Sequence, residues 1–92
     1  MRPSPYQRPR LAKSARLQTD RVTGNPVLLN QETVLVLNQT GYHVLRLCDG
    51  TQTISEIIGT LAKQYQIPVS ALSEEVSHYI DAISVKGLIE WA

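Results

Sequence analysis

The stretch that decides the fold is LNQTGYHVLRLCDGTQTISEI, residues 37–57. It contains two helix starts, because Asn38 and Thr53 belong to the residue types that cap helix N-termini. Thr53 is followed three residues later by Glu56, which is the spacing of a capping box. Between the two starts, Asp49-Gly50 is a turn that ends the first helix. The stretch predicts two short helices, and none of its residue patterns is typical of catalysis.

Apolar side chains after residue 38 fall into three segments with the i, i+3, i+4, i+7 spacing of amphipathic helices. They are Gly41, Val44, Leu45 and Cys48 in the first segment, Ile54, Ile57, Ile58, Leu61, Ala62 and Tyr65 in the second, and Leu72, Val76, Tyr79, Ile80 and Ile83 in the third. Pro68 separates the second segment from the third, and Gly87 is the expected C-cap of the third. The pattern therefore predicts three helices, with residues 88–91 as a short extended tail.

Three strands are predicted before the helices. Ala15, Leu17 and Thr19 alternate with polar residues, which indicates a half-exposed strand over residues 15–20. The segments PVLL (26–29) and TVLVL (33–37) follow, each after a short turn. Such strands form an antiparallel meander with the first and third strands at its edges. The expected fold is α+β and resembles a winged helix-turn-helix, with a three-stranded antiparallel sheet followed by three helices.

The third strand is apolar on both faces. If Leu35 and Leu37 face the core, Val34 and Val36 point the other way. A sheet with one wet face would carry polar residues at those two positions. An apolar edge strand is prone to unwanted pairing unless it is covered or used by a partner. The pattern predicts that a partner binds along this strand.

Charge is divided unevenly along the chain. The net charge of +1 is the sum of +5 over residues 1–21 (six Lys and Arg, one Asp) and −4 over the remainder (three Lys and Arg, seven Asp and Glu). We interpret residues 1–13 as a flexible basic N-terminal arm and residues 14–92 as the folded domain. The arm is either a solvated tail or a segment that docks on an acidic surface of a partner; on the second hypothesis, its deletion leaves the fold intact. A nucleic-acid tail fits less well, because prolines and wide spacing dilute the charge.

No pattern of catalytic or metal-binding residues is present in the sequence. The single cysteine, Cys48, excludes an internal disulfide and is expected to be a buried structural thiol. His43 and His78 fall in different predicted helices and belong to no ligand-spaced set, so neither a metal nor a cofactor is expected. There is no Gly-rich phosphate loop and no G-x-S-x-G motif. A chain of 92 residues with none of these motifs is expected not to be an enzyme.

Membrane and DNA partners are not expected. No apolar run approaches the roughly 18 residues of a transmembrane helix, and the N-terminus lacks the apolar segment of a signal peptide, so a cytoplasmic location is predicted. A DNA-recognition helix is basic, whereas the third predicted helix carries Glu74, Glu75 and Asp81 against Lys86. Binding to DNA is therefore the weaker interpretation of the winged-helix pattern.

Several residues together give the chain a resemblance to a known family. These are Pro9 and Leu11, the pair Leu28-Leu29 with Glu32, the strand end Leu35, Leu37 and Asn38, the run Leu47-Cys48-Asp49-Gly50 with Thr53, Glu56, Ile57, Ile58 and Leu61, and the closing Gly87-Leu88-Ile89. From about residue 9 to the C-terminus, the chain resembles PqqD, an accessory protein of pyrroloquinoline quinone (PQQ) biosynthesis. An Asp-Gly turn followed three residues later by a Thr-capped amphipathic helix is the most specific of these features.

The resemblance implies a RiPP recognition element, a non-catalytic peptide chaperone that binds the leader of a precursor peptide. In the PqqD case the precursor is PqqA, and the radical-SAM enzyme PqqE cross-links its Glu and Tyr side chains. The leader is held as an added strand beside the third strand and against the third helix. The residues expected to bind it are Thr33, Val34, Leu35, Val36, Leu37, Val76, Tyr79, Ile80 and Ile83. A recognition domain from another peptide-modification pathway and a winged-helix DNA-binding protein stay open as alternatives, as does ordinary core packing for Tyr79 and Ile83.

Overall fold

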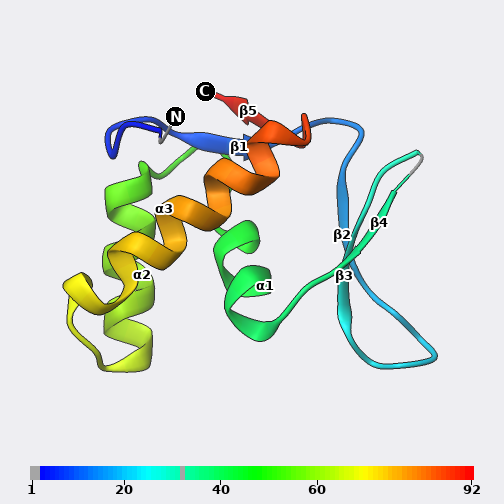
Figure 1. The fold of residues 1–92 in the computed structure, drawn as a ribbon, viewed down its shortest axis with the longest axis horizontal. Coiled ribbons are helices and arrows are strands. Elements are labelled where there is room, and N and C mark those ends of the chain that lie inside the picture. Colours follow the sequence, from blue (N-terminus) through cyan, green and yellow to red (C-terminus); the bar gives the residue numbers. More distant parts are fainter. Residues whose placement is uncertain (1–2, 32) are drawn as a thin grey trace.

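The structure is a computed structural model that describes residues 3–31 and 33–92. These residues form five strands and three helices. In chain order they are β1 (Pro9–Leu11), β2 (Arg16–Thr19), β3 (Pro26–Leu29), β4 (Val34–Val36), α1 (Gln39–Arg46), α2 (Ile54–Tyr65), α3 (Val69–Val85) and β5 (Ile89–Trp91). Figure 1 shows the three helices gathered at one side of the molecule and the strands β2, β3 and β4 at the other. The predicted α+β class with a winged helix-turn-helix-like arrangement is confirmed.

The three-stranded sheet has the predicted meander order, β2-β3-β4, and both pairs are antiparallel. Its register places Leu17, Leu28 and Leu35 in one row across the strands. Leu28 is fully buried, and Leu17 and Leu35 pack against the core. This row marks the inner face of the sheet, and α1 packs close to it. The edge positions predicted for the first and third of these strands are confirmed.

The core is built from the apolar stripes that the helical spacing predicted. Its members on the helices are Val44, Leu45, Ile54, Ile57, Ile58, Leu61, Ala62, Leu72, Val76, Ile80 and Ile83. Cys48 joins this cluster from the turn after α1, while Tyr65 and Tyr79 lie half-buried at its margin. Burial of apolar area on this scale is the main stabilising contribution in a chain of this size.

Both predicted helix caps are present. The Asn38 side chain accepts a hydrogen bond from the Gly41 N–H at 2.7 Å. Thr53 and Glu56 form the full capping box: the Thr53 hydroxyl oxygen accepts from the Glu56 N–H at 3.1 Å, and Glu56 Oε1 accepts from the Thr53 N–H at 2.8 Å. Each such cap is worth about 1 kcal/mol of helix stability. At the end of α3 the C-cap is Lys86, and the predicted Gly87 follows it with a left-handed φ of 77°.

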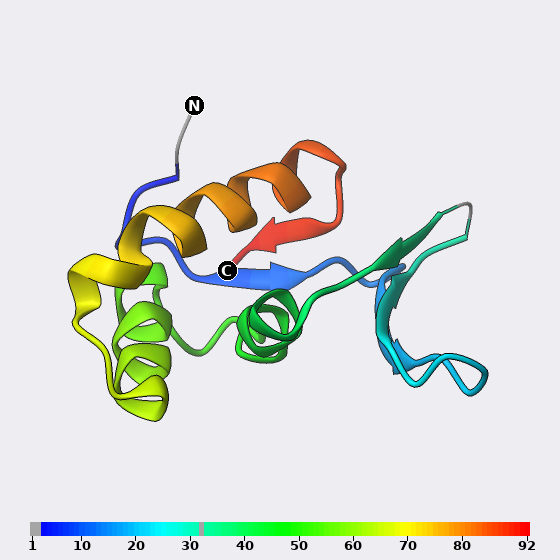
Figure 2. The same cartoon turned by 60° about the horizontal axis from the view of Figure 1, so that its bottom comes forward.

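A second, two-stranded sheet was not predicted from the sequence. Strand β1 pairs antiparallel with β5, so that Pro9 lies opposite Trp91 and Leu11 opposite Ile89 (Figures 1 and 2). The Leu11 N–H also donates to the Cys48 carbonyl at 3.0 Å. Main-chain hydrogen bonds also join Pro5 and Gln7 to the start of α2, and Ala12 to Leu88. The expectation of a flexible arm over residues 1–13 is thus wrong for residues 5–12, and the predicted tail at 88–91 is paired through β5. The sequence indicated an extended segment at 88–91, but strands of three residues are too short to show a period of two, so the pairing of β1 with β5 had no signal.

Two basic residues of the same segment form surface ion pairs. Arg10 lies 3.0 Å from Glu90, and Arg8 lies 4.0 Å from Glu56. These pairs are solvent-exposed, and each therefore contributes little to stability. They do, however, neutralise two of the positive charges that the N-terminal segment was expected to present to a partner.

Metal-binding clusters and membrane-spanning helices are both absent from residues 3–31 and 33–92. These ranges contain no group of three or more His, Cys, Asp or Glu side chains placed to hold a metal ion. Within the same ranges, no helix has the length and apolarity that crossing a bilayer requires.

Deleting residues 1–13 is expected to destabilise the protein strongly. The deletion removes β1 together with two buried side chains, Pro9 and Ala12, and leaves β5 unpaired. We expect the melting temperature to fall by about 10 °C or more, or the chain not to fold, as measured by circular dichroism. A deletion of residues 1–3 alone is the control and should melt close to the intact chain. Equal melting of all three proteins would contradict a structural role for β1.

The thiol of Cys48 is expected to be unreactive in the folded protein. Its side chain is 3% exposed, and burial, with a smaller contribution from Asp49, raises its pKa from 9.0 to about 12. Because the folded pKa lies above the unfolded value, the neutral thiol contributes stability below about pH 9 that is lost as the pH rises toward 12. At pH 8, a disulfide reagent should label the native protein at least about a hundredfold more slowly than the chain in denaturant. Equal labelling rates would show that Cys48 is open to solvent.

Candidate peptide-binding site

Strand β4 ends the three-stranded sheet, and no strand among residues 3–31 and 33–92 pairs with its other edge. The Leu37 N–H donates to the Pro26 carbonyl at 2.9 Å, and the Thr33 carbonyl accepts from the Asn30 N–H at 3.0 Å, so both residues direct these groups toward β3. Main-chain groups alternate in direction along a strand, and Val34 and Val36 therefore direct theirs to the unpaired edge. Of the expected range Thr33 to Leu37, these two residues are the ones positioned to pair with an added strand.

The side chains of β4 alternate as the sequence predicted. Leu37 is 6% exposed and Leu35 is half-buried, whereas Val34 and Val36 are 64% and 71% exposed. Val34 and Val36 lie on what we call the outer face of the sheet, which is opposite the Leu17–Leu28–Leu35 row. By strand register, its six residues are Arg16, Gln18, Val27, Leu29, Val34 and Val36.

A shallow apolar hollow lies between the first turn of α1 and one face of α3. Its volume is about 160 Å³. The residues that line it are Asn38, Thr40, Gly41, Val44, Glu75, Val76, His78, Tyr79 and Ala82. Asn38 follows β4 by two residues, so the hollow begins where the unpaired edge ends. A strand added beside β4 would direct alternate side chains toward this side of the sheet.

The face of α3 on the hollow differs from the one expected. Ile80 is 0% and Ile83 4% exposed, and both belong to the core, so neither is available to a peptide. Val76 is also fully buried, although it contributes to the lining of the hollow. Of the four expected α3 residues, Tyr79 alone is half-exposed on the hollow. For Ile83, the alternative of ordinary core packing is the one that the structure shows.

Sequence reasoning identified Tyr79 on this face of α3 but missed its neighbours Glu75, His78 and Ala82. Glu75, His78, Tyr79 and Ala82 follow the i, i+3, i+4, i+7 spacing and lie next to the core stripe around the helix. The sequence contained one signal for this face. Tyr79 adds an apolar side chain next to the core position Ile80, and the small Ala82 follows Tyr79 by three residues, so the two lie on the same side of the helix.

Tyr79 contacts α1 closely. A Cβ atom added to Gly41 would lie 2.5 Å from Tyr79 Oη and 2.7 Å from its Cζ, which shows that the ring rests on the backbone of the helix's first turn. Burial, with a smaller contribution from Cys48, raises the pKa of Tyr79 above its ordinary value. The phenol is thus protonated at neutral pH and forms an uncharged wall of the hollow.

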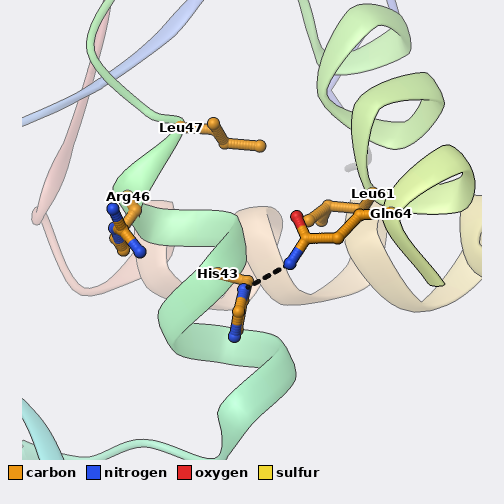
Figure 3. Close-up of a pocket in the computed structure, with 5 residues that line it drawn as sticks. All are labelled: His43, Arg46, Leu47, Leu61 and Gln64. Atoms are coloured by element: carbon orange, nitrogen blue, oxygen red, sulfur yellow. Dashed lines mark hydrogen bonds between the residues drawn. The ribbon is translucent and has the colours of Figure 1, made fainter.

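A second hollow, of about 180 Å³, lies between α1 and α2 (Figure 3). It is lined by His43, Arg46, Leu47, Leu61 and Gln64. Gln64 Nε2 is 3.3 Å from His43 Nδ1, and this contact joins the two helices. His43 also meets Tyr42 and Tyr65 edge to face. The contacts of His43 with Gln64 and Tyr65 join α1 to α2, and the hollow includes no residue of β4 or α3.

The comparison with known proteins decides the family. Residues 26–89 match the family model "Coenzyme PQQ synthesis protein D (PqqD)". This chain belongs to the PqqD family. A relative from Rhodopseudomonas palustris (strain HaA2), named "PqqA binding protein", is 30% identical over 86 residues, which are 94% of this chain and 84% of that protein. A protein of the same name from Rhizobium meliloti (strain 1021) is 27% identical and spans 88% of this chain and 83% of its own length.

A solved structure shares the fold. It is the solution structure of the PqqD part of Methylobacterium extorquens PqqCD, described as a functional, stand-alone RiPP recognition element. It is similar to this chain with a TM-score of 0.76 and 29% sequence identity, over 89% of this chain and 87% of that one. The resemblance to PqqD noted in the sequence is thereby confirmed, and the β2–β4 sheet with three helices is the arrangement of a PqqD-family domain.

Replacing Gly41 by Ala is expected to displace the Tyr79 ring. At an ordinary helix position this change stabilises by about 1 kcal/mol, but here the new methyl group collides with Tyr79. We expect the gain to be absent in the intact protein and to appear when Tyr79 is also replaced by Ala. Chemical denaturation of the four proteins of this double-mutant cycle measures the coupling. Additive effects would contradict the contact.

Proposed function

We propose that this chain is a non-catalytic peptide chaperone of PQQ biosynthesis. It binds the leader of a PqqA-like precursor as a strand added to β4 and presents the precursor to a PqqE-like radical-SAM enzyme. One observation carries the proposal: the unpaired edge of β4 leads directly to the apolar hollow on α3. The names of the relatives, which describe proteins that bind PqqA, support the same role.

In this proposal, main-chain pairing provides affinity for the leader, and side-chain contacts provide selectivity. An extended leader beside β4 exchanges hydrogen bonds with Val34 and Val36, and this pairing contributes affinity without regard to sequence. Its side chains alternate in direction. One set enters the hollow against Tyr79 and Ala82, and this set selects the leader by shape. The other set lies on the outer face beside the Val34 and Val36 side chains.

The alternatives are less well supported. For DNA binding, α3 would serve as the recognition helix, yet it carries Glu74, Glu75 and Asp81 and no Lys or Arg of its own. A leader from another peptide-modification pathway would use the same edge and hollow. A short precursor reading frame and a radical-SAM gene beside this gene would favour the PQQ pathway. A cytoplasmic location stays a prediction from the sequence.

Replacing Val36 by Pro is the direct test of the binding edge. The substitution removes an N–H that points away from β3, so the sheet retains its internal hydrogen bonds while the leader loses a partner. We expect leader affinity, measured by calorimetry with a synthetic leader peptide from the neighbouring precursor gene, to fall about tenfold or more. The melting temperature should change little in comparison.

The matched control is Thr19→Pro on β2. The Asp20 N–H donates to the Asn25 carbonyl at 2.8 Å, so the alternating Thr19 N–H points to the sheet's other unpaired edge. This variant therefore makes the same chemical change at an edge that the leader does not use, and it should bind the leader as the intact chain does. Full leader affinity in a folded Val36→Pro variant would rule out β4 as the binding edge.

A further inference from the structure

We propose that the outer face of the three-stranded sheet docks the modifying enzyme, through an enzyme surface in which apolar side chains are flanked by carboxylates. This inference rests on the proposed function for the identity of the partner. It assigns the enzyme to a surface separate from the β4 edge and the α3 hollow, so one molecule of this chain would hold leader and enzyme at the same time.

The outer face carries exposed apolar side chains, and no described helix or strand covers it. Val34 and Val36 are 64% and 71% exposed, and Leu29 lies half-buried beside them in the register of β3 and β4. Val27, on the same face, is only 5% exposed, although neither it nor Leu29 belongs to the core cluster on the other side of the sheet. Figure 1 shows α1, α2 and α3 on one side of this sheet and no described element beyond it, and Figure 2 agrees. An apolar surface of this kind marks an interaction site.

Positive charge adjoins this apolar row. Leu29 and Arg16 lie opposite one another in the register of β2 and β3. They also line a hollow of about 380 Å³, together with Lys13, Ser14, Asn30 and Gln31. Neither Lys13 nor Arg16 forms an ion pair with a residue in the described ranges, whereas Arg8 and Arg10 are paired with Glu56 and Glu90. Two cations beside an apolar row are complementary to a partner surface of carboxylates beside apolar side chains.

The leader would enlarge the same face. When it pairs with β4, its outward side chains extend the sheet surface by one strand. An enzyme docked on the outer face would then contact both this chain and the leader. We therefore expect the leader and the enzyme to strengthen each other's binding by the same factor.

The test uses purified PqqE-like enzyme from the same genome and the full chain, with binding measured by biolayer interferometry at 50, 150 and 500 mM salt. In the double variant Lys13→Glu/Arg16→Glu, enzyme affinity should fall at least tenfold at 150 mM salt and lose most of its salt dependence. Calorimetry should show leader affinity unchanged within twofold. The control Lys63→Glu/Lys86→Glu makes the same change in net charge at two exposed sites on α2 and at the end of α3, and it should keep the enzyme affinity within threefold.

A second pair of variants tests the sign of the interaction at one position. Gln18 is exposed on the outer face, on edge strand β2 opposite Val27, so Gln18→Glu should weaken enzyme binding and Gln18→Lys should strengthen it. The docking surface would be overturned if the two double variants changed enzyme affinity equally, or if neither changed it. A parallel loss of leader affinity in Lys13→Glu/Arg16→Glu would overturn it as well. So would self-association of the intact chain that Lys13→Glu/Arg16→Glu abolishes, because the face would then join two copies. Failure of the intact chain to bind the leader would instead count against the proposed function.

Discussion

The orientation of α3 is the constraint on which the rest of the structure depends. Val76 and Ile80 are completely buried and Ile83 nearly so, and these contacts hold one face of the helix against the core. Because helical positions are fixed relative to one another, this burial presents Glu75, His78, Tyr79 and Ala82 to the first turn of α1. The packing of α3 against the core is therefore sufficient to place the residues that line the hollow beside β4. A change that rotated α3 by one residue would replace the hollow with core side chains.

Elements with strong local signals were predictable from the sequence. The caps at Asn38 and Thr53, the helical stripes and the alternation of β4 all depend on residues within a few positions of one another. The β1–β5 pair depends on two three-residue segments at opposite ends of the chain, which have no period to detect. The α3 face was missed for a different reason. The apolar stripe identifies what a helix buries, whereas a binding face on the adjacent stripe has mixed composition and no spacing of its own.

The two unpaired edges of the sheet are treated differently by the sequence. Strand β2 carries Arg16 and Gln18 on its exposed positions, and such polar residues discourage pairing with other chains. Strand β4 carries Val34 and Val36 instead and has no comparable protection. If avoiding aggregation were the sole constraint on the sequence, polar residues would be expected on both edge strands. The unprotected edge of β4 is consistent with the proposed pairing with a leader strand.

The pairing of β1 with β5 also determines how this fold can be attached to other proteins. Pro9 lies opposite Trp91, and the Ala92 N–H donates to the Arg8 carbonyl at 2.8 Å, so the first and last strands lie together at one end of the domain. Figure 1 shows both termini at a distance from β4. A relative from Methylorubrum extorquens, named "Bifunctional coenzyme PQQ synthesis protein C/D", matches 89% of this chain with only 22% of its own length. In a domain with this geometry, a covalent link to a larger enzyme through either terminus adds mass at the β1–β5 end and leaves the opposite end of the molecule open.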